Sequence, residues 1–205
     1  MIVVADSSPL IVLVNIGQIQ ILPALFATII IPPQIAAELS DAKRPQPVRD
    51  FIAARPVWLK VQAPAVIESI PEIHEGEQAA ISLATELQAD LLLIDEMDGR
   101  RAALARNLAI TGTVGILERA AEGGLLDLSD AFVRIKKTDS WISAKLLDSE
   151  LERFRQQQRE QQRRKERFNH LESISLVPGV DQCPGRRRQF QFDAAIRRYV
   201  DALIQ

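Results

Sequence analysis

The fold is indicated first by residues 2–10, which read Ile-Val-Val-Ala-Asp-Ser-Ser-Pro-Leu. The apolar and largely β-branched run Ile2–Ala5 is typical of a strand buried on both faces of a parallel sheet. Asp6 ends this run, and the Ser-Ser-Pro that follows consists of residue types that begin helices. A buried strand followed at once by a helix is the usual opening of an α/β fold.

The same alternation of buried strand and amphipathic helix continues along the chain. Further strands are predicted at 28–31, 58–61, 91–94 and 109–112, with helices at 19–26, 32–39, 47–55, 75–87, 98–108 and 113–121. After residue 130 only helices are predicted, at 131–137, 142–154 and 192–203, with turns at 177–179 and 183–185. This order predicts an α/β protein with a mostly parallel sheet covered on both faces.

Composition and charge divide the chain into two parts. Its 205 residues are 47% hydrophobic with a net charge of -2, which excludes wholesale disorder. Residues 1–150 carry 13 Lys and Arg against 20 Asp and Glu, a net charge of -7, whereas residues 151–205 carry 12 against 7, a net charge of +5. We expect an acidic domain over residues 1–154 and a basic C-terminal extension over residues 155–205, which is either helical or partly disordered. A basic extension favours nucleic acid or an acidic protein as a partner.

Several classes of protein are excluded. The single Cys183 rules out an internal disulfide framework and a zinc–thiolate cage, and it favours a reducing compartment. The apolar run 19–35 is interrupted by Pro23, Pro32 and Pro33, so no membrane helix is predicted. The first 16 residues lack a basic leader, so secretion is not predicted either. The expectation is a cytoplasmic protein.

Four carboxylates fall where strands end or on helices beside those ends. Asp6 and Asp95 follow buried apolar runs, Glu38 lies on the helix after the second strand, and Glu77 lies one turn into the helix before Asp95. Ligands of open parallel sheets bind beyond the carboxyl ends of the strands, so these side chains are expected to converge there. Clustered carboxylates repel one another, and a divalent cation compensates that charge. Oxygen-only ligation suits Mg²⁺ or Mn²⁺, which activate water against phosphodiesters.

These carboxylates also have ordinary structural interpretations. Asp6 and Asp98 are residue types that cap helices, and Glu77 lies in a first turn, where the helix dipole favours acids. Glu38 is alternatively an exposed helix residue. Ser8 either caps the first helix or forms a hydrogen bond with a site carboxylate.

Candidate RNA contacts are similarly open to two interpretations. Arg100 and Arg101 either contact RNA phosphates or lie on a solvated helix face. Thr113 either contacts substrate or caps its helix. The stretch 155–167, nearly all Gln, Arg, Glu and Lys, is either a solvated arm or an arm that binds nucleic acid.

Several segments together resemble one family. They are Asp-Ser-Ser-Pro-Leu-Ile at 6–11, Glu-Gly-Glu-Gln-Ala-Ala at 75–80, Leu-Ile-Asp-Glu at 93–96 followed by Arg100 and Arg101, and Gly-Thr-Val-Gly-Ile-Leu at 112–117 followed by Ala120 and Gly124. The resemblance, over roughly residues 1–150, is to PIN domains, in an uncharacterised branch close to the VapC-type toxins. It implies a three-layer α/β/α sandwich with a ribonuclease site. The residues that it assigns as catalytic carboxylates and metal ligands are Asp6, Glu38, Glu77 and Asp95, with Asp98 or Glu96 as a further ligand.

The resemblance supplies the first hypothesis for function. The protein is expected to be a metal-dependent endoribonuclease that hydrolyses RNA phosphodiester bonds with Mg²⁺ or Mn²⁺ and leaves a 5′-phosphate. The resemblance also implies the toxin of a toxin–antitoxin-like pair, a small antitoxin partner and a homodimer. The alternative hypothesis is a catalytically weak or inactive PIN-fold module that binds nucleic acid or protein.

Overall fold

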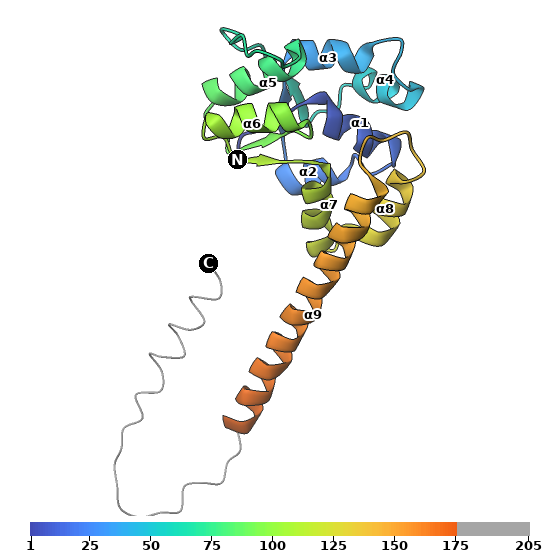
Figure 1. Cartoon of the computed structure of the whole chain (residues 1–205), viewed down its shortest axis with the longest axis vertical. Helices are drawn as coiled ribbons and strands as arrows, with labels where there is room; N and C mark the ends of the chain where they lie inside the picture. Colours follow the sequence, from blue (N-terminus) through green and yellow to red (C-terminus); the bar gives the residue numbers. More distant parts are fainter. Residues whose placement is uncertain (176–205) are drawn as a thin grey trace, which may run out of the picture. The chain divides into compact units, whose positions relative to one another are not determined.

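The computed structural model describes residues 1–175, with side chains up to residue 168, and its core is a parallel sheet (Figure 1). The strands are β1 (Val3–Ala5), β2 (Ile29–Ile31), β3 (Leu59–Val61), β4 (Leu91–Leu93) and β5 (Ile110–Thr111). They pair in the order β3-β2-β1-β4-β5, and every pair is parallel. The predicted α/β class with a parallel sheet is confirmed.

Helices connect the strands and extend the chain beyond them. They are α1 (Ser7–Asn15), α2 (Ile21–Phe26), α3 (Pro33–Ser40), α4 (Gln46–Ala53), α5 (Glu75–Glu86), α6 (Met97–Ala105), α7 (Thr113–Glu122), α8 (Leu128–Ile135) and α9 (Ala144–Ser175). None of these described helices is long and apolar enough to cross a membrane. The turns predicted at 177–179 and 183–185 and the helix predicted at 192–203 lie outside the described residues.

Side chains of successive strand residues enter two separate cores. Val3 and Ala5 of β1 pack in one core with apolar residues of α1, α7 and α8, whereas Val4 packs in a second core with residues of α5 and α6. Successive side chains of a strand point to opposite faces of the sheet, so these two cores lie on opposite faces. The result is the predicted three-layer arrangement, with helices on both sides of buried strands.

Most predicted helix boundaries are shifted by one to three residues, and at two helix starts a local turn or cap accounts for the shift. The helix predicted from residue 19 begins at Ile21, because the residues before it form tighter turns: the Ile21 N–H donates to the Gln18 carbonyl at 3.1 Å and the Leu22 N–H to the Ile19 carbonyl at 3.2 Å. The helix predicted from residue 131 begins three residues earlier, at Leu128. Here the Asp127 side chain accepts a hydrogen bond from the Asp130 N–H at 2.8 Å, which caps the helix.

Helix α9 joins the helix predicted at 142–154 to the polar stretch whose structure the sequence left open. Leu147 and Phe154 in its first part are buried in the core that contains Val3. The chain divides into two units, Met1–Gln156 and Gln157–Gln205, and every side chain described in the second unit is exposed. The helical form of residues 157–168 therefore does not come from packing in a core.

The direction in which strands are added to the sheet changes between β1 and β4. From β1 the chain proceeds to β2 and β3 on one side, and then crosses to β4 on the other side of β1. At the carboxyl ends of this central pair, the Asp6 N–H donates to the Leu93 carbonyl at 2.9 Å. Open α/β sheets bind their ligands at such a switch point, so the fold itself directs attention to Asp6.

Replacing Asp127 with Ala is expected to lower the free energy of unfolding by about 1 kcal/mol, because α8 loses its N-terminal cap. Urea denaturation followed by far-UV circular dichroism measures the change. Asp139→Ala is the matched control, since Asp139 is an exposed acid outside any described helix and its removal changes the charge equally. Equal stability of the two variants would show that the cap does not stabilise α8.

Candidate active site

Asp6 is the most buried carboxylate of the predicted set, with 2% of its surface exposed. It lies directly after β1 at the N-cap of α1, and its Oδ2 accepts a hydrogen bond from the Ser8 N–H at 3.3 Å. Burial, with smaller contributions from the charges of Glu77 and Glu38, raises the pKa of Asp6 from 3.8 to about 7. Asp6 is therefore close to the other two acids and is protonated over much of the range below neutral pH.

Glu38, on α3, faces the start of α1. Its Oε1 accepts a hydrogen bond from the Ser7 hydroxyl at 2.9 Å, and the same oxygen pairs with the Arg44 guanidinium. Ser7 is 4% exposed, so its hydroxyl links two elements inside the structure. The sequence had suggested Ser8 for such a contact, but Ser8 contributes its backbone N–H to Asp6.

Glu77 has a buried carboxylate oxygen that lacks a hydrogen-bond partner in the described part of the chain. It is the third residue of α5, it is 7% exposed, and its Oε2 accepts from the His74 N–H at 3.4 Å. Its Oε1 is buried and has no hydrogen-bond partner among the described residues. Burial raises the pKa of Glu77, and the charges of Glu96 and Glu38 add to this effect. A buried carboxylate oxygen without a donor is costly, and a cation is one way to satisfy it.

Asp95 is held by the start of α7. Its Oδ1 accepts from the Thr113 N–H at 2.7 Å and its Oδ2 accepts from the Thr113 hydroxyl at 2.6 Å. Thr113 is fully buried, so its hydroxyl is positioned to orient Asp95 rather than to meet a ligand from solvent. Beside this pair, Arg100 donates to the Ile94 carbonyl at 2.9 Å. Burial raises the pKa of Asp95, while the bonds from Thr113 and the charge of Arg100 oppose that rise.

The two further candidate ligands, Asp98 and Glu96, differ in their contacts with the other acids. Asp98 has 64% of its side chain exposed and pairs with Arg101 on the same helix at 2.9 Å. Glu96 is exposed at the N-cap of α6, and its charge raises the pKa of both Glu77 and Asp95. Of the two residues, Glu96 is thus the one whose charge connects Asp95 to the other acids.

Glycines occupy positions where these carboxylates leave no room for a side chain. A Cβ added at Gly99 would lie 2.8 Å from Glu77 Oε1, and one added at Gly112 would lie 2.5 Å from Asp95 Oδ1. Both distances are shorter than any ordinary contact. Sequence reasoning did not assign these glycines to the site, although each stands in or just before the first turn of a helix that follows a strand.

The structure therefore brings Asp6, Glu38 and Glu77 into one electrostatically coupled group, which we name the carboxylate cluster. Across the described part of the chain, no three His, Cys, Asp or Glu side chains are arranged as a ready metal-binding group. Glu38 is occupied by Ser7 and Arg44, and Asp95 by Thr113. The donor chemistry nevertheless fits a hard cation, because all donors are oxygens and one buried oxygen of Glu77 is unsatisfied.

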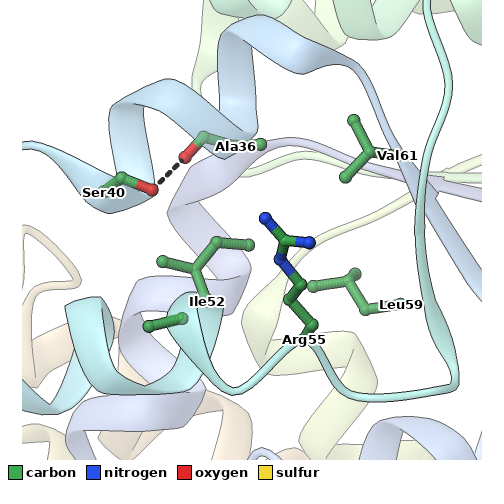
Figure 2. Close-up of a pocket in the computed structure, with 7 residues that line it drawn as sticks. Ala36, Ser40, Ile52, Arg55, Leu59 and Val61 are labelled. Carbon is green, nitrogen blue, oxygen red and sulfur yellow. Dashed lines mark hydrogen bonds between the residues drawn. The ribbon is translucent and has the colours of Figure 1, made fainter.

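A hollow of about 470 Å³ lies elsewhere, between α3, α4 and the edge strand β3. Figure 2 shows Arg55 pointing into it among the aliphatic side chains of Ile52, Leu59 and Val61. The remaining residues around it are Ala36, Ser40 and Ala53. No carboxylate lines this hollow, so it is separate from the cluster.

Comparison with known proteins places this arrangement in a family. A family model described as PIN domain matches residues 2–156. The chain belongs to the PIN domain family. Searches of curated proteins and of solved structures each found no significant match. PIN domains are generally nucleases that act on nucleic acid, typically with divalent metals, and the carboxylate cluster lies within the part of the chain that matches.

Asp6→Asn is expected to stabilise the metal-free protein in a pH-dependent way. Because the pKa of Asp6 is about 7 in the folded state against 3.8 ordinarily, the folded chain holds a proton that the unfolded chain lacks between these values. The stabilisation from that proton is complete below pH 3.8 and is lost as the pH rises towards 7. The variant gains up to about 4 kcal/mol at pH 8 and almost nothing near pH 4. Urea denaturation in EDTA measures the free energy of unfolding of the variant and of the wild-type protein at the two pH values. A stability gain that does not depend on pH would contradict the raised pKa of Asp6.

Thr113→Val is expected to destabilise the protein by about 1–3 kcal/mol without any RNA present, because the part-buried Oδ2 of Asp95 loses its hydroxyl donor. Thr113→Ser keeps the hydroxyl and should retain most of the stability. Thermal or urea unfolding compares the two variants. Unchanged stability of Thr113→Val combined with weakened RNA binding would instead assign Thr113 to substrate binding.

Proposed function

We propose that this PIN domain is a metal-dependent endoribonuclease whose site is centred on the carboxylate cluster. The observation that carries the proposal is the unpartnered buried Oε1 of Glu77, next to Asp6 and Glu38, at the sheet's switch point. A structural role for these acids would satisfy each oxygen with a protein donor. An unsatisfied oxygen among like charges favours a cationic ligand.

Asp6, Glu38 and Glu77 would hold Mg²⁺ or Mn²⁺, with Asp95 beside them and Glu96 or Asp98 as a further ligand. When bound, the cation lowers the pKa of water and offsets charge on the scissile phosphate. Thr113 orients Asp95 through two hydrogen bonds, and Ser7 orients Glu38. Arg44 pairs with Oε1 of Glu38, so Oε2 would be the oxygen that ligates, and the Arg44 guanidinium would lie beside the site as a donor for phosphate.

The wider assignment follows the family resemblance. We propose that residues 1–154 form the catalytic domain and residues 155–205 an extension, in a cytoplasmic protein. The product ends would be 5′-phosphates, and the protein would act as the toxin of a toxin–antitoxin-like pair, as a homodimer silenced by a small antitoxin. Arg100 and Arg101 remain the candidates for RNA contact near the site. Arg100 is tied to the Ile94 carbonyl, whereas Arg101 has 72% of its side chain exposed.

The test compares Glu77→Gln with Glu75→Gln, which removes an exposed acid two residues away on the same helix. Purified protein is incubated with labelled RNA and Mn²⁺ or Mg²⁺, with EDTA as a control. Loss of a metal ligand costs several kcal/mol of transition-state stabilisation, so Glu77→Gln should cleave at least about 100-fold more slowly. Glu75→Gln should retain the wild-type rate, and calorimetry should show Mn²⁺ binding lost only in Glu77→Gln.

Two outcomes would overturn the proposal. Cleavage that persists in EDTA or in Glu77→Gln would show that the cluster does not hold the catalytic metal. Absence of cleavage in the wild-type protein, together with salt-sensitive RNA binding, would instead favour a PIN-fold binding module. Asp98→Asn, assayed alongside, decides whether Asp98 takes part or only pairs with Arg101.

A further inference from the structure

The described part of the second unit is an exposed helix with a regular spacing of arginines. Within residues 157–168 there are five Lys and Arg against two Glu. Arg159, Arg163 and Arg167 are four residues apart, and all are exposed. Residues four apart lie one above the other on a helix, and each step turns by about 40°. These three side chains, the arginine stripe, therefore lie on one side of α9 over about 12 Å.

The segment of α9 that carries the arginine stripe has no apolar face, unlike the first part of the same helix. Between residues 157 and 167 every side chain is Gln, Arg, Glu or Lys. Such a helix has nothing to insert into a membrane or to bury against a partner helix. Its composition still favours helix in water, since it lacks Gly, Pro and β-branched residues and gains a Gln162–Glu166 hydrogen bond at 2.9 Å. The segment is thus a helix whose exposed surface is charged and polar.

The stripe arginines are available to an external anion. None of the ion pairs found between described residues involves Arg159, Arg163 or Arg167. The stripe also lies beyond residue 156, where the match to the PIN family ends. Residues 1–150 carry a net charge of -7, so they do not provide a general attraction for a polyanion.

We propose that the arginine stripe of α9 is a docking surface for the phosphate backbone of RNA. The inference rests on the proposed substrate class but not on cleavage. Guanidinium groups bind phosphate oxygens in a bidentate fashion, and contacts with a polyanion need no apolar surface. Binding through these contacts is independent of RNA sequence and highly sensitive to salt.

The test measures binding of the full-length protein to a fluorescent single-stranded RNA of mixed sequence by anisotropy, in EDTA and at several salt concentrations. The stripe variant is Arg159→Gln with Arg163→Gln. The matched control is Arg164→Gln with Lys165→Gln, which removes the same charge from the same helix outside the stripe. The stripe variant should bind about tenfold more weakly near 100 mM salt, and the slope of log affinity against log salt should fall by about 1.4. The control should change much less.

The outcomes are distinguishable from those of the nuclease test. Glu77→Gln should bind RNA like the wild-type protein while failing to cleave it. If RNA binding weakened equally in both double variants, or in neither, the proposed role of the arginine stripe would be overturned. Stripe-dependent binding to vesicles containing phosphatidylserine without stripe-dependent RNA binding would also overturn it. The wild-type protein could also bind RNA without cleaving it. If the stripe variant then lost RNA binding, the stripe would be supported and the nuclease proposal rejected. Unchanged circular dichroism in all variants confirms that α9 is retained.

Discussion

The site depends on the cost of burying Asp6 and Glu77 beside Glu38. Burial disfavours each charge and the neighbouring carboxylates add repulsion, so the pKa of both buried acids is raised. The fold offsets part of this cost with main-chain donors, from Ser8 to Asp6 and from His74 to Glu77. These donors lie in the first turn of α1 and at the N-cap of α5, so the start of a helix fixes the position of each of the two acids. Protonation of Asp6 offsets a further part of the cost below neutral pH, and a bound cation is a second way to offset it.

The glycines show that this cluster is part of the protein core rather than an addition to it. A side chain at Gly99 would meet both the Glu77 carboxylate and the Ile94 side chain, at 2.8 and 2.6 Å. Ile94 is completely buried in the core between the sheet and α5. The position of α6 is therefore coupled to the position of a site carboxylate through one small residue. A change in helix packing on this side of the sheet would move Glu77, so the packing of this core and the geometry of the proposed site depend on the same contacts.

Local patterns in the sequence were enough to predict most of the fold. Strands buried on both faces are continuous apolar runs, and Val3 and Val4 enter different cores as that pattern requires. Such patterns could not predict contacts between residues that are distant in the sequence. The pairing of Asp95 with Thr113 joins residues 18 apart across the ends of β4 and β5. That Ser7, rather than Ser8, reaches Glu38 depends on how α1 is rotated against α3. The polar stretch after residue 154 has no apolar periodicity, so sequence could not decide between helix and disorder there.

The two opposed charges of the chain correspond to two different physical tasks. Acids gathered at the sheet edge can hold a cation, but their field repels a polyanion from a distance. Raised pKa values and a bound cation reduce that repulsion at the cluster, while the other acids of residues 1–150 remain. If the substrate is RNA, as proposed, its attraction would come from elsewhere in the chain, and residues 151–205 carry a net charge of +5. A separate basic segment would allow the affinity for a polyanion to change with salt and charge without altering the carboxylates of the proposed site.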